Sequence, residues 1–566
     1  MRFSYDALRR CISVVLSIFI LLPAALAQTP TAAPPFASHA QGRPEILSYI
    51  RSGWSSLSRS MVDCRSLTDS KVTNGPVLYL PSGMKIPAAV QALQTKCRVR
   101  IEHLPRTISH LGDVLPADLK EEGLLYLPNQ YVVPGGRFNE MYGWDSYFII
   151  LGLLDDGRDD LARDIVDNFF FEIENYGAVL NANRTYYLTR SQPPLLSSMI
   201  REIYEHAATP LDKTWLTHAY AMAIRDHALW TSDIHRAGDT GLARYHDVGA
   251  GPVPEMADDS TYYPDVIRWL VAHPGSGDNY LLSASEDPSP SERATLAKTS
   301  CDLAESKVCA QAFVSGHRLT AAYFQGDRAM RESGFDTTFR FGAFSGSTED
   351  FAPVCLNSLL FKYEQDLAHF ADLLGKPEES AHWTAVAEAR RIAIDKYLWN
   401  EKAGFFFDYN TVTGKQSTYE YLSGYYPLWA GLANLRQAKQ LELHLADFEH
   451  DGGLAMSTFV SGTQWDLPYG WAPSNWFAVQ GLERYRMHED ARRLARKFSS
   501  TVVENFLRDG TIREKYNVVS GSANITVTVG YQANIIGFGW TNGVFLRMQD
   551  LLHAGPKPYH TNISGH

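Results

Sequence analysis

The feature that most constrains the fold of this sequence is a series of paired segments with helical periodicity. In residues 157–177, apolar residues recur every three or four positions and mark one face of a helix. The same spacing returns in 357–399, where Gly375 ends one helix before the next begins, and in 474–510, which breaks near His488. Strands do not alternate with these helices, so the pattern predicts an all-α domain built from helix hairpins.

Helix hairpins in series can close into a toroid, stack as a solenoid or pack as an irregular bundle. The sequence has no regular repeat period, which disfavours a repeat solenoid. Periodicity alone does not choose between a closed barrel and an irregular bundle. Residues 41–555 contain no convincing internal linker and are predicted to form one domain, with short strand candidates such as 403–410 between the hairpins.

The N-terminus has the pattern of an export signal. A basic start precedes an apolar run that is too short to favour a membrane span, and the small residues at Ala25–Ala27 suit cleavage. The pattern predicts a signal peptide over 1–27, a disordered linker over 28–40 that is rich in proline and alanine, and a flexible tail over 556–566. We therefore expect an exported protein, periplasmic or secreted, without a membrane anchor after cleavage.

Charge and cysteine content limit the partners of the chain. The formal net charge is −11, which argues against nucleic acid and anionic membranes as partners. In an oxidising compartment Cys64 could pair with Cys97, and Cys301 with Cys309, which would leave Cys355 without a partner. No C-x-x-C motif or Cys/His cluster indicates a metal site.

Two loops concentrate tryptophan, glycine and charged residues. Residues 134–148 read PGGRFNEMYGWDSYF, and residues 464–476 read QWDLPYGWAPSNW. A plain connector rarely contains so many of these residues, and loops of this kind often carry function.

Both loops resemble the signatures of the trehalases, the inverting hydrolases of α,α-trehalose. The resemblance covers roughly 120–550 and implies an (α/α)6 barrel, a small disaccharide as substrate, and no metal or organic cofactor; we expect a monomer. Supporting stretches follow in the order of the family at 181–194, 251–255, 332–336, 513–518 and 537–544.

Inverting hydrolysis needs two carboxyl groups, a protonated acid and an ionised base that activates water, about 6.5–9.5 Å apart. The motifs of the family place the acid at Asp336, in ESGFD, and the base at Glu514, in REKY. An apolar environment raises the pKa of a carboxyl group, so Phe335 and Phe339 would keep Asp336 protonated if their rings face it. Glu332 is the local alternative to Asp336, and we expect it to pair with an arginine or cap a turn.

The same matching of motifs predicts the contacts with substrate. Arginines and carboxylates suit a disaccharide, because its hydroxyl groups need donors and acceptors in fixed directions. The alternative for each arginine is a structural ion pair. The predicted substrate-binding residues are Arg137, Trp144, Asp145, Asn181, Arg190, Ser191, Gln192, Glu255 and Gly334. Residues expected to line, orient or support the site are Arg340, Trp465, Asp466 and Trp540.

Three features depart from the pattern of the family. Val253 stands where most trehalases carry arginine, so a guanidinium is lost from a position that contacts sugar. Residues 525–536, ITVTVGYQANII, replace a glycine-rich run that ends in Glu-Tyr and that we interpret as a lid; this segment is predicted to be stiffer. Cys355 occupies a position that is usually aspartate and supports the site.

These observations predict hydrolysis of α,α-trehalose to two glucose molecules with Asp336 as acid and Glu514 as base. Two alternatives remain, because the lid and one binding arginine are missing. The protein could hydrolyse another small α-glucoside, or it could be a non-hydrolytic periplasmic sugar-binding relative. Retention of both carboxyl groups favours an enzyme, because a binding protein needs no acid–base pair.

Overall fold

The structure is a computed structural model that describes residues 35–68, 75–258, 261–283, 313–314, 316–528, 531 and 533–553. The predicted signal peptide over 1–27, the tail over 556–566 and the pair Cys301 and Cys309 lie outside the described residues.

Helix α1 begins at Pro35, so residues 35–40 are helical and not part of a disordered linker as predicted. Proline is tolerated at the first position of a helix, where its missing N–H group has no partner in any case. The remainder of the predicted linker, residues 28–34, lies outside the described residues.

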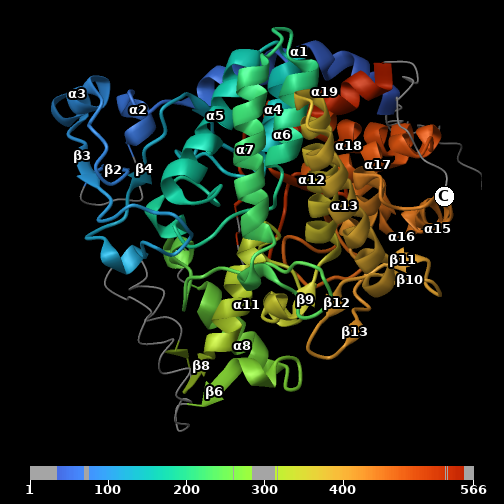
Figure 1. Cartoon of the computed structure of the whole chain (residues 1–566). Coiled ribbons are helices and arrows are strands. Elements are labelled where there is room, and N and C mark those ends of the chain that lie inside the picture. The colour runs from blue at the N-terminus through green and yellow to red at the C-terminus, as the bar shows by residue number, and fades with distance from the viewer. Residues whose placement is uncertain are drawn as a thin grey trace, which may run out of the picture.

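In the part of the chain that the structure describes, six helices contact one another in a closed ring. Each contacts the next in the order α4, α6, α12, α14, α17 and α19, and α19 packs back against α4. Figure 1 shows α4, α6 and α12 from the side. The ring is the inner layer of an (α/α)6 barrel, as predicted. The inner helices are α4 (Asp145–Asp155), α6 (Leu196–His206), α12 (Val354–Leu374), α14 (Tyr426–Ala430), α17 (Ala472–Arg484) and α19 (Gly539–His553).

A second set of helices alternates with the inner helices along the chain. For example, α5 packs on α4 and α6, α13 packs on α12, and α1 closes the layer against α18 and α19. The outer helices are α1 (Pro35–Leu57), α5 (Asp159–Tyr176), α7 (Lys213–Trp230), α13 (Pro377–Tyr397), α15 (Leu435–Leu443) and α18 (His488–Asp509).

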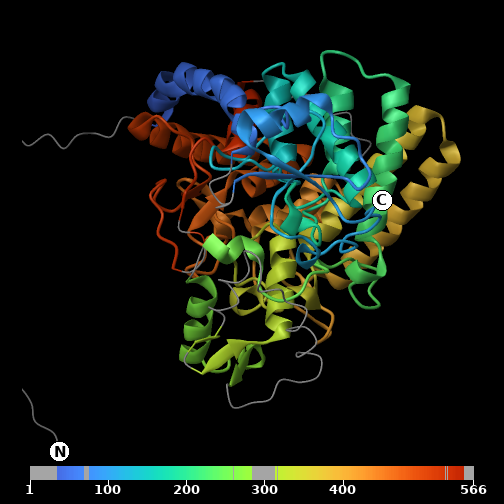
Figure 2. The ribbon, with the colours of Figure 1, turned by 90° about the vertical axis from the view of Figure 1, so that its left-hand side faces the viewer.

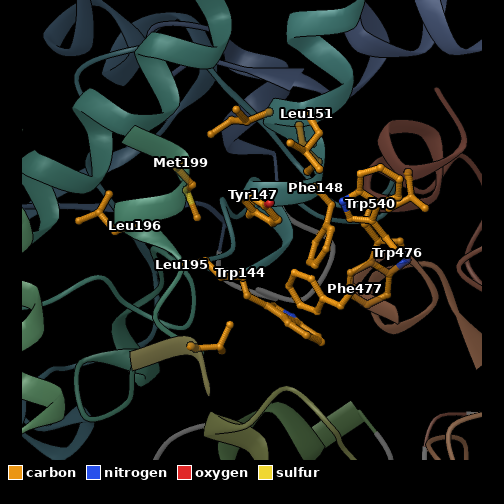
Figure 3. Packing of buried hydrophobic residues seen from close by; sticks show 14 of the residues in the cluster. Trp144, Tyr147, Phe148, Leu151, Leu195, Leu196, Met199, Trp476, Phe477 and Trp540 are labelled. Carbon is orange, nitrogen blue, oxygen red and sulfur yellow. The ribbon is translucent and has the colours of Figure 1, made fainter. Parts of the chain in front are cut away.

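Apolar stripes and stop signals explain why these segments are helices. The predicted stripe of α5 is buried throughout, and Gly177 ends the helix with a φ of 87°, a conformation that favours glycine. Gly375 ends α12 in the same way. Inside the barrel, the aromatic side chains of Trp144, Phe148 and Phe477 point toward one another (Figure 3). The buried stripe of α5 comprises Leu161, Ile165, Val166, Phe169 and Ile173.

The chain between α7 and α12 forms a separate region at one end of the barrel, seen below it in Figures 1 and 2. This region contains α8 (Tyr262–Ala272) and α11 (Ala321–Glu332) and has a small apolar core of its own. Val253 is fully buried in that core. The region matters for the site because α11 ends directly before the segment that carries Asp336.

Short strands connect the helices and form small sheets. Strands β2, β3 and β4 form a parallel sheet near the N-terminus, and a disulfide joins Cys64 to Cys97 beside it, with Cα atoms 5.6 Å apart. This is one of the two pairings that the sequence left open. The remaining helices are α2 (Cys64–Leu67), α3 (Ala88–Cys97) and α16 (Leu445–Phe448).

The strands are only two to four residues long. They include β11 and β12, which confirm the strand candidate in 403–410. None of the described helices is long and apolar enough to cross a membrane. The strands are β1 (Ser58–Arg59), β2 (Val77–Leu80), β3 (Arg100–His103), β4 (Leu124–Leu125), β5 (Tyr131–Val132), β6 (Leu281–Ser283), β7 (Phe313–Val314), β8 (His317–Leu319), β9 (Phe351–Ala352), β10 (Trp399–Asn400), β11 (Phe405–Phe406), β12 (Tyr409–Asn410), β13 (Lys415–Gln416), β14 (Glu449–His450), β15 (Gly453–Leu454), β16 (Tyr469–Trp471) and β17 (Lys515–Asn517).

Candidate active site

The segment that carries Asp336 turns sharply where α11 ends. Gly334 has a φ of 76°, and a Cβ atom there would lie 2.9 Å from the ring of Trp144, so glycine is required at this position. Phe335 inserts edge-on between Trp144 and Trp465, with ring centroids 5.6 and 5.1 Å away. The turn thus packs against both signature loops.

Asp336 combines partial exposure with a largely dehydrated environment. Its side chain is 26% exposed, and its Oδ2 lies 3.7 Å from Nη1 of Arg331. Burial raises the pKa of Asp336 to about 7; the Arg331 guanidinium opposes this rise, and the Glu255 carboxylate adds to it. A carboxyl group with this pKa still holds its proton near neutral pH, as a general acid must.

The flanking phenylalanines stabilise the turn through aromatic packing. Phe339 lies edge-on to Trp269 and Phe344, with centroids 5.1 and 4.7 Å away. The Phe335 ring also lies 5.6 Å from the Arg340 guanidinium, and no described contact of either ring explains the raised pKa of Asp336, which comes chiefly from burial.

The second signature loop braces the same segment from the opposite side. The Asp466 carboxylate accepts hydrogen bonds from Oγ1 of Thr338 and from N–H of Phe339, both at 2.9 Å. N–H of Trp465 donates to the Thr337 carbonyl at 3.1 Å. Trp465 and Asp466 therefore support the segment that carries Asp336. The sequence predicted that these two residues line or support the site.

Glu514 is placed by a strand pair. Strand β17 pairs with β16 so that Lys515 lies opposite Trp471, and the indole N–H of Trp540 donates to the Glu514 carbonyl at 3.1 Å. The buried Lys515 ammonium donates to Oε2 of Glu514 at 3.1 Å and lies over the Trp471 ring. The Glu514 side chain is 16% exposed, so the carboxylate combines a fixed cation with access to solvent.

Asp145 links the two proposed catalytic carboxyl groups electrostatically. It is the first residue of α4 and is buried. Burial raises the pKa of Asp145 well above its ordinary value, and the charges of Glu514 and Asp336 raise it further. Asp145, Asp336 and Glu514 therefore share one electrostatic environment.

Residues 181–192 form one wall beside these carboxyl groups. N–H of Asn181 donates to the Arg190 carbonyl at 2.9 Å, and N–H of Trp144 donates to Oε1 of Gln192 at the same distance. These bonds fix the wall to the first signature loop. Ser191 is fully buried within it.

Arg190 and Glu255 form an ion pair, and Arg190 also lies 3.5 Å from the Asp247 carboxylate and over the Tyr187 ring. Among the described residues, Oε2 of Glu255 and Nε of Arg190 have no hydrogen-bond partner. Buried polar atoms in this state normally require a partner. Arg190 and Glu255 therefore form the ion pair that was the alternative to substrate binding, and each also has a polar atom left for a polar ligand.

Arg137 differs from the other predicted residues. Its side chain is exposed, and its guanidinium lies over the neighbouring Phe138 ring at 5.3 Å. No described contact connects the Arg137 side chain to the other residues that were predicted to bind substrate.

Sequence reasoning missed Arg331, the buried last-turn arginine of α11. It pairs with Asp327, donates to the Tyr531 hydroxyl at 3.0 Å and approaches Asp336. Val253 is buried in the small core of its own region, and Arg331 places a guanidinium beside Asp336. The absence of an arginine at position 253 was the sequence feature that could have pointed to another arginine near the site.

The segment that replaces the glycine-rich run contacts both sides of the site. It is irregular where described, although its composition predicted a stiff segment rich in β-branched residues. Tyr531 accepts from Arg331, Asn534 exchanges hydrogen bonds with the Lys515 backbone, and N–H of Thr528 donates to the Gly462 carbonyl at 2.8 Å.

Two further expectations concern Glu332 and Arg340. Among the described residues, Glu332 pairs with no arginine and caps no turn; it contacts His235 and two backbone N–H groups. Arg340 binds Asp408 through two hydrogen bonds of 2.7 and 2.6 Å and also contacts Sγ of Cys355 at 3.5 Å. Asp408 thus supplies the carboxylate that Cys355 cannot, and both residues support the segment after Asp336.

No group of three or more His, Cys, Asp or Glu side chains among the described residues could hold a metal ion.

The chain is similar to known proteins in sequence and in fold. The profile of a protein family described as Trehalase matches residues 84–553. The chain is 36% identical over 542 residues to a cytosolic neutral trehalase of Neurospora crassa, covering 85% of this chain and 68% of that protein. It is 36% identical over 448 residues to a probable trehalase of Eremothecium gossypii, covering 74% of this chain and 57% of that protein.

A solved structure of neutral trehalase from Saccharomyces cerevisiae superposes with a TM-score of 0.72 at 30% identity, covering 91% of this chain and 95% of that one. Several matching relatives carry the word cytosolic in their names. These names contradict the prediction of an exported, periplasmic or secreted protein. That prediction rested only on the composition of residues 1–27, which can resemble a signal without acting as one.

Proposed function

The chain belongs to the trehalase family, and from this premise we propose that it hydrolyses α,α-trehalose to two glucose molecules with inversion at the attacked anomeric carbon. The observation that carries the proposal is the contrast between Asp336, whose pKa is about 7, and Glu514, which touches the Lys515 ammonium. One carboxyl group is suited to give a proton and the other to take one.

In the proposed reaction Glu514 removes a proton from a water molecule as that water attacks the anomeric carbon. The bond from this carbon to the bridging oxygen breaks, and Asp336 gives its proton to that oxygen. One glucose leaves with its configuration retained and the other carries the inverted centre. Exchange of protons with solvent then returns Asp336 to its acid form and Glu514 to its base form.

Substrate binding is proposed for the polar groups around these carboxyl groups. Arg190 with Glu255 and Asp145 offer donors and acceptors to sugar hydroxyl groups. Arg331 takes the role of the arginine that Val253 replaces, and its contact with Tyr531 connects binding to the altered segment. The backbone around Ser191 and Gln192 and the flat ring of Trp144 complete the proposed pocket, with Asn181 holding its wall and Gly334 permitting close approach.

The direct test is an NMR time course of purified full-length protein with trehalose. Equal initial amounts of α- and β-glucose would support inversion, because one product is inverted and the other is released as the α anomer. Initial formation of α-glucose alone would contradict inversion, and absence of turnover across a broad pH range would contradict the trehalase proposal.

Hydrolysis of another small α-glucoside is the second candidate function. Val253 and the altered segment at 525–536 favour it, because they change groups at the binding site while both carboxyl groups remain. The value of kcat/KM for trehalose compared with a panel of α-linked glucose disaccharides separates the two. Binding of trehalose without turnover of any member of the panel would instead favour the non-hydrolytic alternative.

A further inference from the structure

We propose that Glu332 and His235 form a positioning pair that fixes the general acid relative to the substrate-binding wall. The inference rests on the proposed function, in which Asp336 is the acid. Neither residue is assigned to the reaction by the motifs of the sequence, and both are fully buried.

Glu332 ties three segments of the chain together. It is the last residue of α11 and lies four positions before Asp336. Its Oε2 accepts a hydrogen bond from N–H of His246 at 2.7 Å, and its Oε1 accepts one from N–H of Ser191 at 3.3 Å. The Glu332 carboxylate therefore connects the segment of Asp336 to residues 181–192, which include Arg190. It also connects that segment to the chain at His246, next to Asp247, which pairs with Arg190.

His235 completes the coordination of this carboxylate. It ends the 3-10 helix η3 (Asp233–His235), and its Nε2 lies 3.2 Å from Oε2 of Glu332. Its Nδ1 lies 3.1 Å from the Leu229 carbonyl, which can only accept, so Nδ1 carries a proton. A second proton must lie between Nε2 and the carboxylate, because two bare acceptors would repel each other. A proton shared in this way leaves the buried pair without net charge.

Because the connection from Glu332 to Asp336 is short, the position of Glu332 determines the position of the Asp336 carboxyl group. Only three residues separate Glu332 from Asp336, and they are held by N–H of Phe335 donating to Oγ of Ser333 at 3.2 Å and by Gly334 packing on Trp144. A tilt of Glu332 would therefore be passed on to Asp336. Displacement of a catalytic group by about 1 Å can cost roughly a hundredfold in rate.

The chain contains a matched control pair outside the site. His227 lies in α7, and its Nε2 is 3.1 Å from Oε1 of the buried Glu364 in α12. Both pairs are buried contacts between a histidine and a glutamate that involve α7 or the turn after it. The His227–Glu364 pair joins two barrel helices and has no described contact with the segment of Asp336.

The experiment compares His235→Asn with His227→Asn in the full-length chain. Asparagine keeps a donor near the position of Nδ1 and loses the Nε2 contact with the glutamate. The two substrates are trehalose, whose leaving group needs the proton of the acid, and α-D-glucosyl fluoride, whose fluoride leaves with much less help.

We expect His235→Asn to lower kcat for trehalose by about 10- to 100-fold, with KM within about threefold of wild type and the fluoride rate nearly unchanged. His227→Asn should leave both rates within about threefold. His235→Gln, which returns an N–H group near the position of Nε2, should recover much of the trehalose rate.

Two results would overturn the inference: His235→Asn behaving like His227→Asn, or a loss of equal size on both substrates. If His235→Asn does not fold, Glu332→Gln gives the same test, because it turns one acceptor of the carboxylate into a donor. Failure of the proposed function is distinguishable, because it would appear in the wild-type protein as absent hydrolysis, or in Asp336→Asn as an unchanged trehalose rate.

Discussion

The two sides of the site present the same chemical group in opposite electrostatic settings. On the acid side, the cation nearest to Asp336 is 3.7 Å away and is shared with Asp327. On the base side, the Lys515 ammonium donates directly to Glu514 at 3.1 Å. Contact with a cation therefore distinguishes the two carboxyl groups in the proposed assignment of roles.

The two sides also come from different parts of the fold. The acid side belongs to the region between α7 and α12, which has its own small core, whereas the base side lies between the barrel helices α18 and α19. The second signature loop meets both, through Asp466 on the acid segment and through Trp471 opposite Lys515. The second signature loop is therefore one of the segments that connect the two sides.

The largest expected effect comes from removing the base. Glu514→Gln should lower kcat by about 10³-fold or more on both trehalose and α-D-glucosyl fluoride, because water must be activated in either reaction. Steady-state rates on the two substrates provide the measurement. If Glu514→Gln lowered kcat for trehalose but not for the fluoride, Glu514 would be the acid, and the roles assigned to the two carboxyl groups would be reversed.

Removal of the acid should separate the two substrates. Asp336→Asn is expected to lower kcat for trehalose by about 10²- to 10⁴-fold while the fluoride rate falls far less, because fluoride needs little protonation. The ratio of the two rates in wild type and variant is the measurement. Persistence of trehalose hydrolysis near the wild-type rate would remove Asp336 from the mechanism.

Arg331 offers a smaller test of the acid side. Arg331→Gln removes a charge that lowers the pKa of Asp336, so the decline of kcat/KM at alkaline pH should move to higher pH. The same variant should lower kcat/KM at pH 6 by about 10- to 100-fold through lost substrate contacts. Arg201→Gln, which removes an arginine paired with Asp366 in the barrel, is the control and should leave the pH profile in place.

The last predicted effect is on stability. Asp336 holds its proton more tightly in the folded chain, with a pKa of about 7, than at its ordinary value of 3.8. Its contribution to folding is therefore full at acid pH and is lost as the pH rises from about 4 through about 7. The free energy of unfolding of Asp336→Asn, relative to wild type, should rise by about 3 kcal/mol between pH 5 and pH 8.

Urea unfolding at the two pH values measures this difference. Asp233→Asn, at a highly exposed position, controls for general effects of the substitution. Equal relative stabilities of Asp336→Asn at both pH values would show that Asp336 is not dehydrated in the folded state.

Local patterns in the sequence predicted the helices well, and the two long signatures identified the family. The stripe of α5 and the stops at Gly177 and Gly375 are local features, and the structure confirms them. The resemblance also led to the carboxyl groups now proposed as catalytic. The disulfide between Cys64 and Cys97 is one of the pairings that the sequence left open, since cysteine spacing alone does not choose partners.

The contacts that tune the site could not be read from the sequence, because they join distant positions. Arg331 meets Tyr531 across 200 residues, and Glu332 meets His235 across 97. Each partner looks ordinary in its local context. The altered segment at 525–536 was interpreted from composition as a stiffer lid, whereas its described contacts show it attached to both sides of the site.

The most direct test of the contrast between the two carboxyl groups is the pH dependence of kcat/KM for trehalose and for α-D-glucosyl fluoride, measured on the wild-type protein. The account predicts that kcat/KM for trehalose declines above a pKa near 7, because Asp336 must be protonated, and that this decline is much weaker for the fluoride. An alkaline decline at the same pH and of the same depth for both substrates would contradict the assignment of Asp336 as the general acid.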